Sequence, residues 1–370
     1  MIIQSVRTAG FRNLKPQRIE LSSQVNAFIG LNAQGKTNIL EAVSVLSDGR
    51  SFRGAGLPEM IRTGETSGAV EGIVTSGNRE SVLKIYLGRG SRQFFVDDQK
   101  IADLRDFLGR FSYVVFSAES MAIIDGEPSA RRDFLDHGWF SLDPLYLLTL
   151  RSYRKILKSR NVLLKSDPRN RTLIETWNTP LSRYAAMIAR ARLQYIRRIG
   201  PVAEAIHSRM TGDRERMEIK YVSAWFDENT PDDRLTDSLH DQLMDRLTRD
   251  IEMDIRRGCT LSGAHRDDLK ITVNGRDLRY YGSRGQKRTA IVSLKLAEIR
   301  IFHDAMNDYP VLLLDDIASE FDDERQKELI RAVPENIQVI ISHTGRFTKS
   351  FDRMIRYFDV SDGCAVPSPQ

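Results

Sequence analysis

The sequence predicts an α/β fold in which a mixed sheet with an antiparallel side sheet is interrupted by an inserted all-helical domain. Strand-like segments alternate with helices at both ends of the chain, helical periodicity dominates the middle, and the strand pattern resumes after Gly258. A chain of 370 residues also exceeds the usual size of one domain. We therefore expect residues 1–130 and 257–370 to form one core and residues 131–256 to form the insertion.

Composition excludes several classes of protein. Hydrophobic residues make up 41% of the chain and charged residues 28%, which argues against disorder. Two cysteines, Cys259 and Cys364, are too few for a disulfide scaffold or a four-thiolate zinc site. The first residues lack a secretory apolar core, and no apolar run approaches the roughly 20 residues that span a bilayer. We expect a cytoplasmic protein without a membrane segment.

The N-terminal part has the pattern of strand, loop and helix. Residues 2–8 and 25–29 have strand character, and residues 37–46 have the periodicity of a helix. Further strands are predicted at residues 67–74, 81–87, 92–96 and 111–117, with a short helical stretch at 103–109. Together these segments predict an α/β lobe with an antiparallel side sheet.

The middle of the chain predicts an antiparallel pair of helices joined by a turn at residues 165–171. Each helix carries an apolar face, formed by Tyr146, Leu150, Tyr153, Leu157 and Leu164 in the first and by Leu181, Tyr184, Ile188, Ala191 and Tyr195 in the second. After Gly258, strands are predicted at 269–275, 311–316 and 337–342, with a helix at about 286–307.

Charge is segregated within the insertion. Residues 151–198 contain 13 Lys and Arg against 2 acidic residues, whereas residues 213–254 contain 6 against 13. A basic helix face is often only solvated, but a net charge of +11 favours contacts to a nucleic-acid backbone. The tyrosines of this stretch lie on its apolar faces, so no platform for stacking unpaired bases is evident there. Backbone contact with duplex or gapped DNA is the prediction.

A glycine loop between the second strand and its helix predicts a phosphate site. Such a loop directs backbone N–H groups at phosphates, and its lysine neutralises the β and γ oxygens. The predicted nucleotide contacts are Gly30, Leu31, Asn32, Ala33, Gln34, Gly35, Lys36, Thr37 and Asn38. The Thr37 hydroxyl is the predicted ligand of Mg²⁺.

Two adjacent carboxylates follow the apolar strand 311–314. A metal held by phosphates requires a carboxylate at such a strand end. We expect Asp315 to contact Mg²⁺, directly or through water, and Asp316 to orient the attacking water.

A third motif, Ser283-Arg284-Gly285-Gln286, precedes the helix at about 286–307. Taken alone, it is better explained as a helix cap. Its position about 28 residues before the double aspartate, however, resembles the order of motifs in ABC-type ATPases with a P-loop core. The resemblance implies that Ser283 reaches the γ-phosphate of a second protomer, that residues 317–322 form a D-loop and that His343 is a switch histidine. Catalysis would then require a homodimer.

Several segments resemble the RecF family of bacterial DNA replication and repair proteins. They are residues 11–14 (FRNL), 49–53 (GRSFR), 115–117 (VFS), 126–136 (GEPSARRDFLD), 153–155, 159–161 and 261–269 (LSGAHRDDL). The resemblance implies an ATP- and Mg²⁺-dependent homodimer with slow ATPase activity that binds DNA. It further implies recombinational gap repair, replication restart and the SOS response to DNA damage, with RecR and RecO as partners that help load RecA.

The resemblance also assigns neighbouring residues. Arg12 and Asn13 are expected to reach nucleotide phosphates, whereas Arg50 and Arg53 are left open between nucleotide and DNA. Arg131 and Arg132 are expected to pair with Asp133 or Asp136. The sequence departs from the family pattern at Arg284, where glutamine is usual, and at Ala118, Ser120 and Ala264.

Three other functions are compatible with parts of this pattern. An SMC-like protein that bridges DNA through a long coiled coil is the main alternative, but a 25-residue helix is only about 37 Å long. A transporter subunit would lack the basic insertion. A small-molecule phosphotransferase would turn over as a monomer and would not need Ser283.

Overall fold

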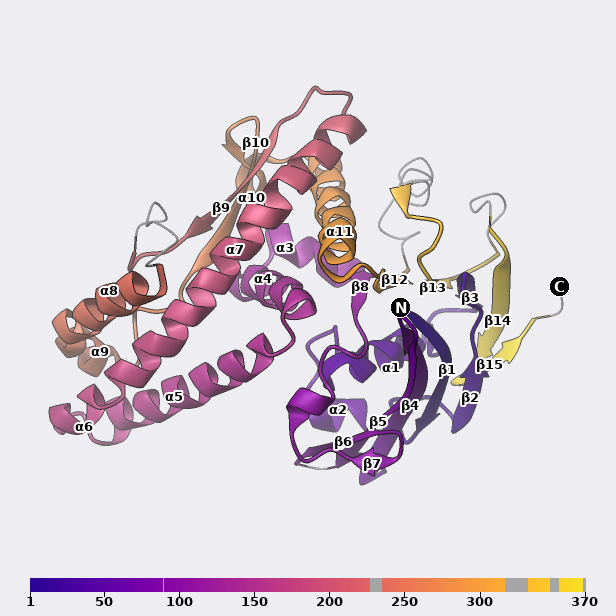
Figure 1. Ribbon diagram of the computed structural model, residues 1–370, viewed down its shortest axis with the longest axis horizontal. Helices are drawn as coiled ribbons and strands as arrows, with labels where there is room; N and C mark the ends of the chain where they lie inside the picture. The colour runs from indigo at the N-terminus through magenta and orange to yellow at the C-terminus, as the bar shows by residue number, and fades with distance from the viewer. Residues whose placement is uncertain (89, 227–234, 317–331, 347–352, 369–370) are drawn as a thin grey trace. The chain divides into compact units, whose positions relative to one another are not determined.

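The computed structural model describes residues 1–88, 90–226, 235–316, 332–346 and 353–368. These residues form two compact units (Figure 1). Unit 1 comprises residues 1–121 and 291–370, and unit 2 comprises residues 122–290.

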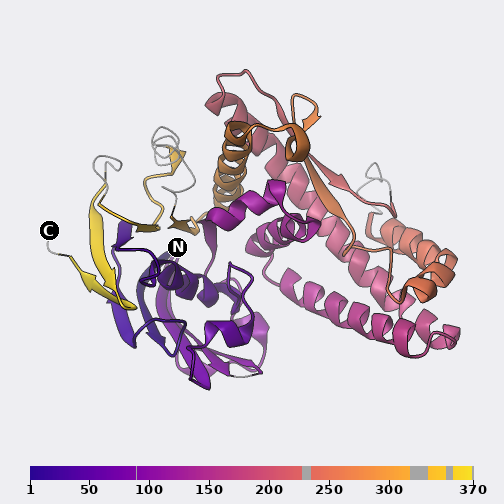
Figure 2. The same cartoon turned by 180° about the vertical axis from the view of Figure 1, so that it is seen from behind.

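A mixed six-stranded sheet carries the phosphate loop in unit 1. Its strands lie in the order β15-β14-β3-β13-β12-β8, and all neighbours are parallel except β15, which returns antiparallel to β14. The bounds are β3 (Val25–Ile29), β8 (Tyr113–Phe116), β12 (Val311–Asp315), β13 (Val339–His343), β14 (Ile355–Ser361) and β15 (Cys364–Pro367). The interior strands β3 and β12 are mostly apolar and are buried along their whole length, as expected for strands with both faces covered. Figure 2 shows the β14–β15 ribbon from behind.

The second sheet of unit 1 is antiparallel and has the order β2-β1-β4-β5-β6-β7. Its strands are β1 (Ile2–Ala9), β2 (Gln17–Glu20), β4 (Ser67–Ser76), β5 (Arg79–Gly88), β6 (Arg92–Val96) and β7 (Gln99–Lys100). Alternate side chains of β4 are buried, as expected for a sheet with one covered face. The predicted side sheet is confirmed.

Helix α1 (Lys36–Asp48) packs between these two sheets and contacts β4 on one side and β13 on the other. Almost all of its residues are therefore buried, including polar ones. At Gly72 of β4 an added Cβ would lie 2.4 Å from Leu46 Cδ1, so only glycine allows the helix to approach this closely. The short elements α2 (Leu57–Met60), η1 (Leu104–Asp106) and η2 (Ala118–Met121) complete this part of the chain.

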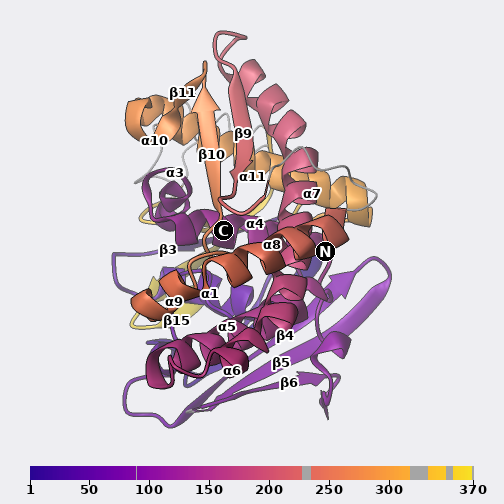
Figure 3. The same cartoon turned by 90° about the vertical axis from the view of Figure 1, so that its left-hand side faces the viewer.

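Unit 2 is built around the long helix α7 (Asn178–Met210), visible in Figures 1 and 3. The other helices are α3 (Ala122–Asp125), α4 (Pro128–Leu142), α5 (Tyr146–Ser166), α6 (Arg171–Glu175), α8 (Leu235–Arg249), α9 (Ile251–Arg257) and α10 (Leu278–Tyr281). Helix α11 (Arg284–Met306) begins in unit 2 and ends in unit 1. The two predicted apolar faces are confirmed, since Tyr153 of α5 and Tyr195 of α7 are buried.

The expectation of an all-helical insertion is wrong at residues 217–222. These residues form β9 (Met217–Val222), which pairs antiparallel with β10 (Asp268–Val273), and β10 pairs with β11 (Arg276–Asp277). Figure 3 shows β9 and β10 side by side. Met217 and Tyr221 are buried while Lys220 is exposed, so the six residues follow the two-residue period of a strand. The α/β class with its mixed and antiparallel sheets is confirmed.

The helices within the described ranges include none that is both long and apolar enough to cross a bilayer.

Candidate nucleotide-binding site

The glycine loop leaves the carboxyl end of β3 and enters α1, as the sequence predicts. Gly35, directly before the helix, has φ 109°, and Ala33 has φ 65°. This left-handed conformation is easy for Gly35 and uncommon for a residue with a side chain such as Ala33, and the two residues together turn the chain sharply into the helix. At Gly30 an added Cβ would lie 2.3 Å from the Val360 carbonyl oxygen of β14. The loop therefore depends on glycine at both of its ends.

Lys36 is folded back over this loop. Its Nζ donates to the carbonyl oxygens of Gly30 and Leu31, both at 2.8 Å, and the residue is 7% exposed. Burial lowers the pKa of Lys36, while the charges of Asp316 and Asp315 act in the opposite direction. The ammonium group thus has partners in the loop that anionic oxygens could replace without leaving it unsatisfied.

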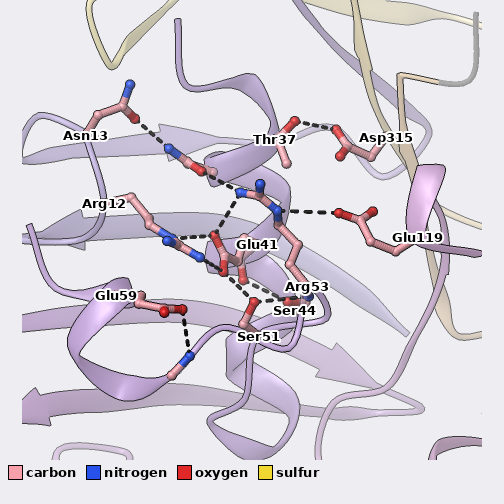
Figure 4. A network of polar contacts seen from close by, with 12 residues as sticks. Arg12, Asn13, Thr37, Glu41, Ser44, Ser51, Arg53, Glu59, Glu119 and Asp315 are labelled. Carbon is pink, nitrogen blue, oxygen red and sulfur yellow. Dashed lines mark hydrogen bonds and ion pairs between the residues drawn. The ribbon is translucent and has the colours of Figure 1, made fainter. Parts of the chain in front are cut away.

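Asp315 connects the loop helix to the neighbouring strands. Its Oδ1 accepts from the Thr37 hydroxyl at 2.8 Å (Figure 4) and from the Ser342 hydroxyl at 2.7 Å. Burial raises the pKa of Asp315, and both hydrogen bonds oppose that effect. The two predicted metal-binding groups, the Thr37 hydroxyl and the Asp315 carboxylate, are therefore in direct contact.

The parallel register of β12 and β13 explains why Asp315 and Ser342 are in contact. Asp315 at the end of β12 lies opposite Ser342 of β13, and His343 of β13 lies opposite Ile29 of β3. Ligands of open α/β sheets bind at such carboxyl strand ends. The backbone N–H of Asp316 donates to Ser342 Oγ at 2.9 Å, so one serine orders both aspartates. His343 Nδ1 lies 2.6 Å from the Gly345 carbonyl oxygen.

Asn13 and Arg12 lie beside the loop, but Arg12 is engaged by a carboxylate of α1. Asn13 Oδ1 accepts from Asn38 Nδ2 at 2.7 Å, which ties the segment after β1 to the first turn of α1. Arg12 donates through Nη2 and Nε to Glu41, at 2.6 and 2.8 Å (Figure 4). Glu41 has no exposed surface.

Glu41 is the residue of this site that sequence reasoning missed. It also accepts from the Ser51 hydroxyl, and Arg53 Nη1 lies 4.0 Å from its Oε2. The signal available in the sequence was a single acidic residue within the apolar run of α1. Arg53 further approaches Glu119 at 3.7 Å, so both sides of its guanidinium face carboxylates of unit 1.

The turn between β14 and β15 supports the loop from the other side. Gln34 accepts through its backbone oxygen from Gly363 N–H at 3.0 Å, and through Oε1 from Asp362 N–H at 2.8 Å. A Cβ on Gly363 would lie 2.1 Å from the Asn13 carbonyl oxygen. Gln34 thus fixes the loop by contacts with a segment more than 300 residues away in the chain.

The Ser283 motif forms the start of α11 in unit 2. Ser283 Oγ accepts from Gln286 N–H at 3.2 Å, while Gln286 Oε1 accepts from Ser283 N–H at 2.9 Å. This reciprocal pair is a capping box. Gln286 Nε2 also donates to Glu215 at 2.9 Å, and Arg284 is exposed. The D-loop expected at residues 317–322 lies outside the described residues.

Two of the thirteen cations in the basic stretch are structural. Arg160 is fully buried and donates to Asp254 at 2.7 Å, and Arg192 forms a two-pronged ion pair with Asp136. The others are exposed, namely Arg151, Arg154, Lys155, Lys158, Lys165, Arg169, Arg171, Arg183, Arg190, Arg197 and Arg198.

Arg131 and Arg132, which precede the basic stretch, are not paired as expected. Arg131 forms its two-pronged ion pair with Asp268 and not with Asp133 or Asp136. Arg132 donates to the Asp267 carbonyl oxygen. Both arginines fasten α4 to the segment that leads into β10, a partner that lies too far away in sequence to be inferred from local spacing.

The donor set at the loop fits Mg²⁺. Thr37 and Asp315 supply the hard oxygen ligands that this ion prefers, next to a loop for phosphates. Across the described ranges, no group of three or more His, Cys, Asp or Glu side chains has metal-site geometry. Mg²⁺ at such sites usually takes its remaining ligands from phosphates and water.

A strand, glycine loop and helix, with an aspartate at the end of another parallel strand of the same sheet, define a P-loop nucleotide-binding protein of the α/β class. The family model described as RecF/RecN/SMC N terminal domain matches residues 2–366. A curated relative named DNA replication and repair protein RecF, from Exiguobacterium sp. strain AT1b, is 37% identical over 93% of this chain and 92% of its own length. The chain belongs to the RecF family.

Two solved structures extend the comparison. A recombination mediator protein RecF determined with ATP, and described as part of the RecFOR pathway, has a TM-score of 0.90 and 34% identity, covering all of this chain and 98% of its own. An SMC head domain bound to the C-terminal winged helix of ScpA has a TM-score of 0.53 and 14% identity, with 100% and 97% coverage, and shares the fold alone.

Proposed function

We propose that this chain is a slow, ATP-dependent DNA-binding ATPase of recombinational gap repair and replication restart. Two protomers would enclose two ATP molecules with Mg²⁺, hold DNA while ATP is bound and release it after hydrolysis. The family further supports action with RecR and RecO to help load RecA, in a cytoplasmic response to DNA damage. A RecF relative at 34% identity over nearly the whole chain carries ATP in its solved structure.

The hydrogen bonds that join Thr37, Asp315 and Ser342 carry this proposal, because through them a hydroxyl and a carboxylate lie together beside the glycine loop. Lys36 would exchange its two carbonyl partners for β and γ oxygens. The backbone N–H groups at the start of α1 would bind phosphate at the positive end of the helix. Bound Mg²⁺ would neutralise the charge that develops on the transferred phosphoryl group.

Hydrolysis would be slow because of the geometry of Asp316. Its carboxylate is one methylene shorter than the glutamate common in ABC-type ATPases, so it would orient water less closely. Its backbone also has φ 47°, a conformation uncommon outside glycine. We assign His343 to the γ-phosphate side, and Ser283 with Gly285 to the nucleotide of the second protomer.

DNA binding rests on the exposed cations of α5 and α7. Eleven of the thirteen Lys and Arg residues between 151 and 198 are exposed, so most of the positive charge of this stretch lies at the surface, although Arg154 and Arg171 also pair with carboxylates there. Contacts of this kind bind the phosphate backbone without sequence preference.

Ser283→Arg tests the two-protomer mechanism. We expect the variant to bind ATP like the wild type, because the hydrogen bonds of Ser283 join it to Gln286 at the start of α11, and to lose hydrolysis and ATP-driven dimerisation. Fluorescent ATP titration, phosphate release and gel filtration measure the three properties. Ser166→Arg, which adds the same charge at the exposed end of α5, is the matched control.

A second variant, Lys36→Ala, should lose ATP binding and dimerisation together. If the wild type bound ATP yet stayed monomeric at micromolar concentration, the proposed mechanism would be wrong. Normal turnover by Ser283→Arg would instead support a monomeric phosphotransferase.

A further inference from the structure

Two neighbouring tyrosines of unit 2 are unusually exposed. Tyr280 and Tyr281 end the short helix α10, and each is 71% exposed. The helix is nevertheless fixed, because Leu278 is 1% exposed and the Asp277 side chain accepts from Arg279 N–H at 3.0 Å. A rigid segment that presents two large aromatic rings to solvent is typical of a binding surface.

The rings are arranged for contact with a planar ligand. The Arg279 guanidinium lies 5.5 Å from the centre of the Tyr280 ring, which orients that ring and supports one of its faces. The Tyr281 ring stands edge-on to it, with centroids 6.5 Å apart and an interplanar angle of 67°. Since both rings remain largely exposed, aromatic surface is left for a ligand to stack on.

A cavity of about 200 Å³ opens beside Tyr280. Its apolar walls come from Ile123, Ile124, Leu269 and Ile271, and its charged lining consists of Arg131, Lys270, Arg279, Asp268 and Asp277. The cavity is smaller than the roughly 300–1,000 Å³ of pockets for drug-sized ligands. It has room for a single flat ring system.

The charge around the tyrosines favours an anionic ligand. Residues 268–288 contain six Lys and Arg against two Asp. Asp268 is held by Arg131 and Lys287 is held by Asp125, which leaves five Lys and Arg against one Asp. The exposed Arg276 and Arg284 lie on either side of the tyrosines in sequence. A flat apolar ring linked to phosphates satisfies both the cavity and the charge. An apolar protein side chain would satisfy the cavity alone.

We propose that Tyr280, Tyr281 and the adjoining cavity form a stacking site for an unpaired DNA base. The proposal deepens the DNA-binding function proposed above and rests on it. Base–aromatic stacking does not depend on sequence, and it adds affinity only where a base is free of its duplex partner. The site would therefore distinguish the single-stranded part of a gap from the duplex that the basic helices hold. The sequence did not indicate it, because neither tyrosine lies in the basic stretch.

The test compares two DNA probes in the presence of ATP at one salt concentration: a blunt duplex, and the same duplex with a single-stranded extension containing 2-aminopurine. For the Tyr280→Ala/Tyr281→Ala variant we expect affinity for the extended probe to fall about 5- to 150-fold, with blunt-duplex affinity unchanged. The Tyr280→Phe/Tyr281→Phe variant keeps the rings and should retain wild-type affinity. Wild-type protein should also quench 2-aminopurine, and the alanine variant should not.

Each other outcome has a distinct meaning. Equal affinity of wild type and alanine variant for the extended probe overturns the stacking site, as does an equal loss on both probes. A loss of ATP-driven dimerisation without a change in probe discrimination assigns the tyrosines to a protein interface and likewise overturns it. If wild-type protein bound neither probe, the proposed DNA-binding function itself would fail.

Discussion

Glu41 is the residue on which the arrangement around the phosphate loop depends. Its buried carboxylate accepts hydrogen bonds from the Arg12 guanidinium and the Ser51 hydroxyl, and thereby joins α1 to the segments after β1 and after α1.

In Glu41→Ala the half-buried Arg12 loses its counter-charge. Removing one partner of a buried pair costs about 3–5 kcal/mol, so we expect a clear loss of stability. Glu41→Gln keeps the size of the side chain and should be milder. Both variants should bind ATP more weakly, because Glu41 no longer fixes Arg12 and the adjacent Asn13 beside the glycine loop.

Thermal unfolding and fluorescent ATP titration measure these effects. Glu20→Gln is the control, since Glu20 pairs with Arg18 on the surface and such pairs contribute about 0–1 kcal/mol. Wild-type stability and ATP affinity in Glu41→Ala would show that Arg12 is positioned by other contacts.

The sequence predicted residues whose role lies within a local motif. Lys36, Thr37 and Asp315 could be assigned because spacing within a glycine loop, or at a strand end, reflects the chemistry of phosphate and metal binding. Glu41 and Gln34 could not, because their partners are brought together only by the packing of α1 between two sheets and by the β14–β15 turn. The partner of Arg131 was misassigned for the same reason.

At the scale of elements, residues 261–268 form the entry to β10 and bury two titratable groups with opposite effects. Burial raises the pKa of Asp267 to about 6, although the Tyr221 hydroxyl and Trp225 Nε1 donate to its carboxylate. Burial lowers the pKa of His265 to about 4, where its Nδ1 lies 2.7 Å from the Tyr153 hydroxyl. The charged form is disfavoured in both cases.

These shifts give stability contributions of opposite sign between about pH 4 and pH 6. In that range folded Asp267 keeps a proton that the unfolded chain has lost, so its contribution to the free energy of unfolding falls as pH rises. Folded His265 lacks a proton that the unfolded chain holds, so its contribution rises with pH. We expect Asp267→Asn to remove the falling contribution, which makes the stability of the variant rise with pH more steeply than that of wild type.

Urea unfolding followed by tryptophan fluorescence measures this slope in unit 2 alone, since Trp139, Trp177 and Trp225 all belong to that unit. Parallel profiles for wild type and Asp267→Asn would contradict the prediction. The strand pairing of this region was not predicted, because β9 has only six residues and its partner β10 follows after α8 and α9. Helical periodicity on both sides concealed it.

At the scale of the whole molecule, the candidate nucleotide site lies in unit 1 and the exposed basic stretch lies in unit 2. The long segments with strong periodicity were predicted correctly, but the bounds of the insertion were not. It was expected at 131–256, whereas unit 2 comprises 122–290 and includes β10, β11 and α10. The number of cations available to DNA did not follow from the sequence, since the burial of Arg160 and Arg192 became clear only from their ion pairs with Asp254 and Asp136.

Salt dependence tests whether the exposed cations of α5 contact DNA. Each phosphate contact adds about 0.9 to the slope of log affinity against log salt concentration, because a condensed counterion is released. Lys155 and Lys158 are both exposed on α5. We expect Lys155→Glu/Lys158→Glu to weaken duplex binding in the presence of ATP and to reduce the slope by about 2, while ATP affinity stays unchanged.

The control is Lys100→Glu/Arg105→Glu, which changes the net charge by the same amount at exposed positions of unit 1 and should keep the wild-type slope. The same reduction in both variants would mean that binding responds to net charge alone, and an unchanged slope in the α5 variant would exclude this helix from the DNA contact.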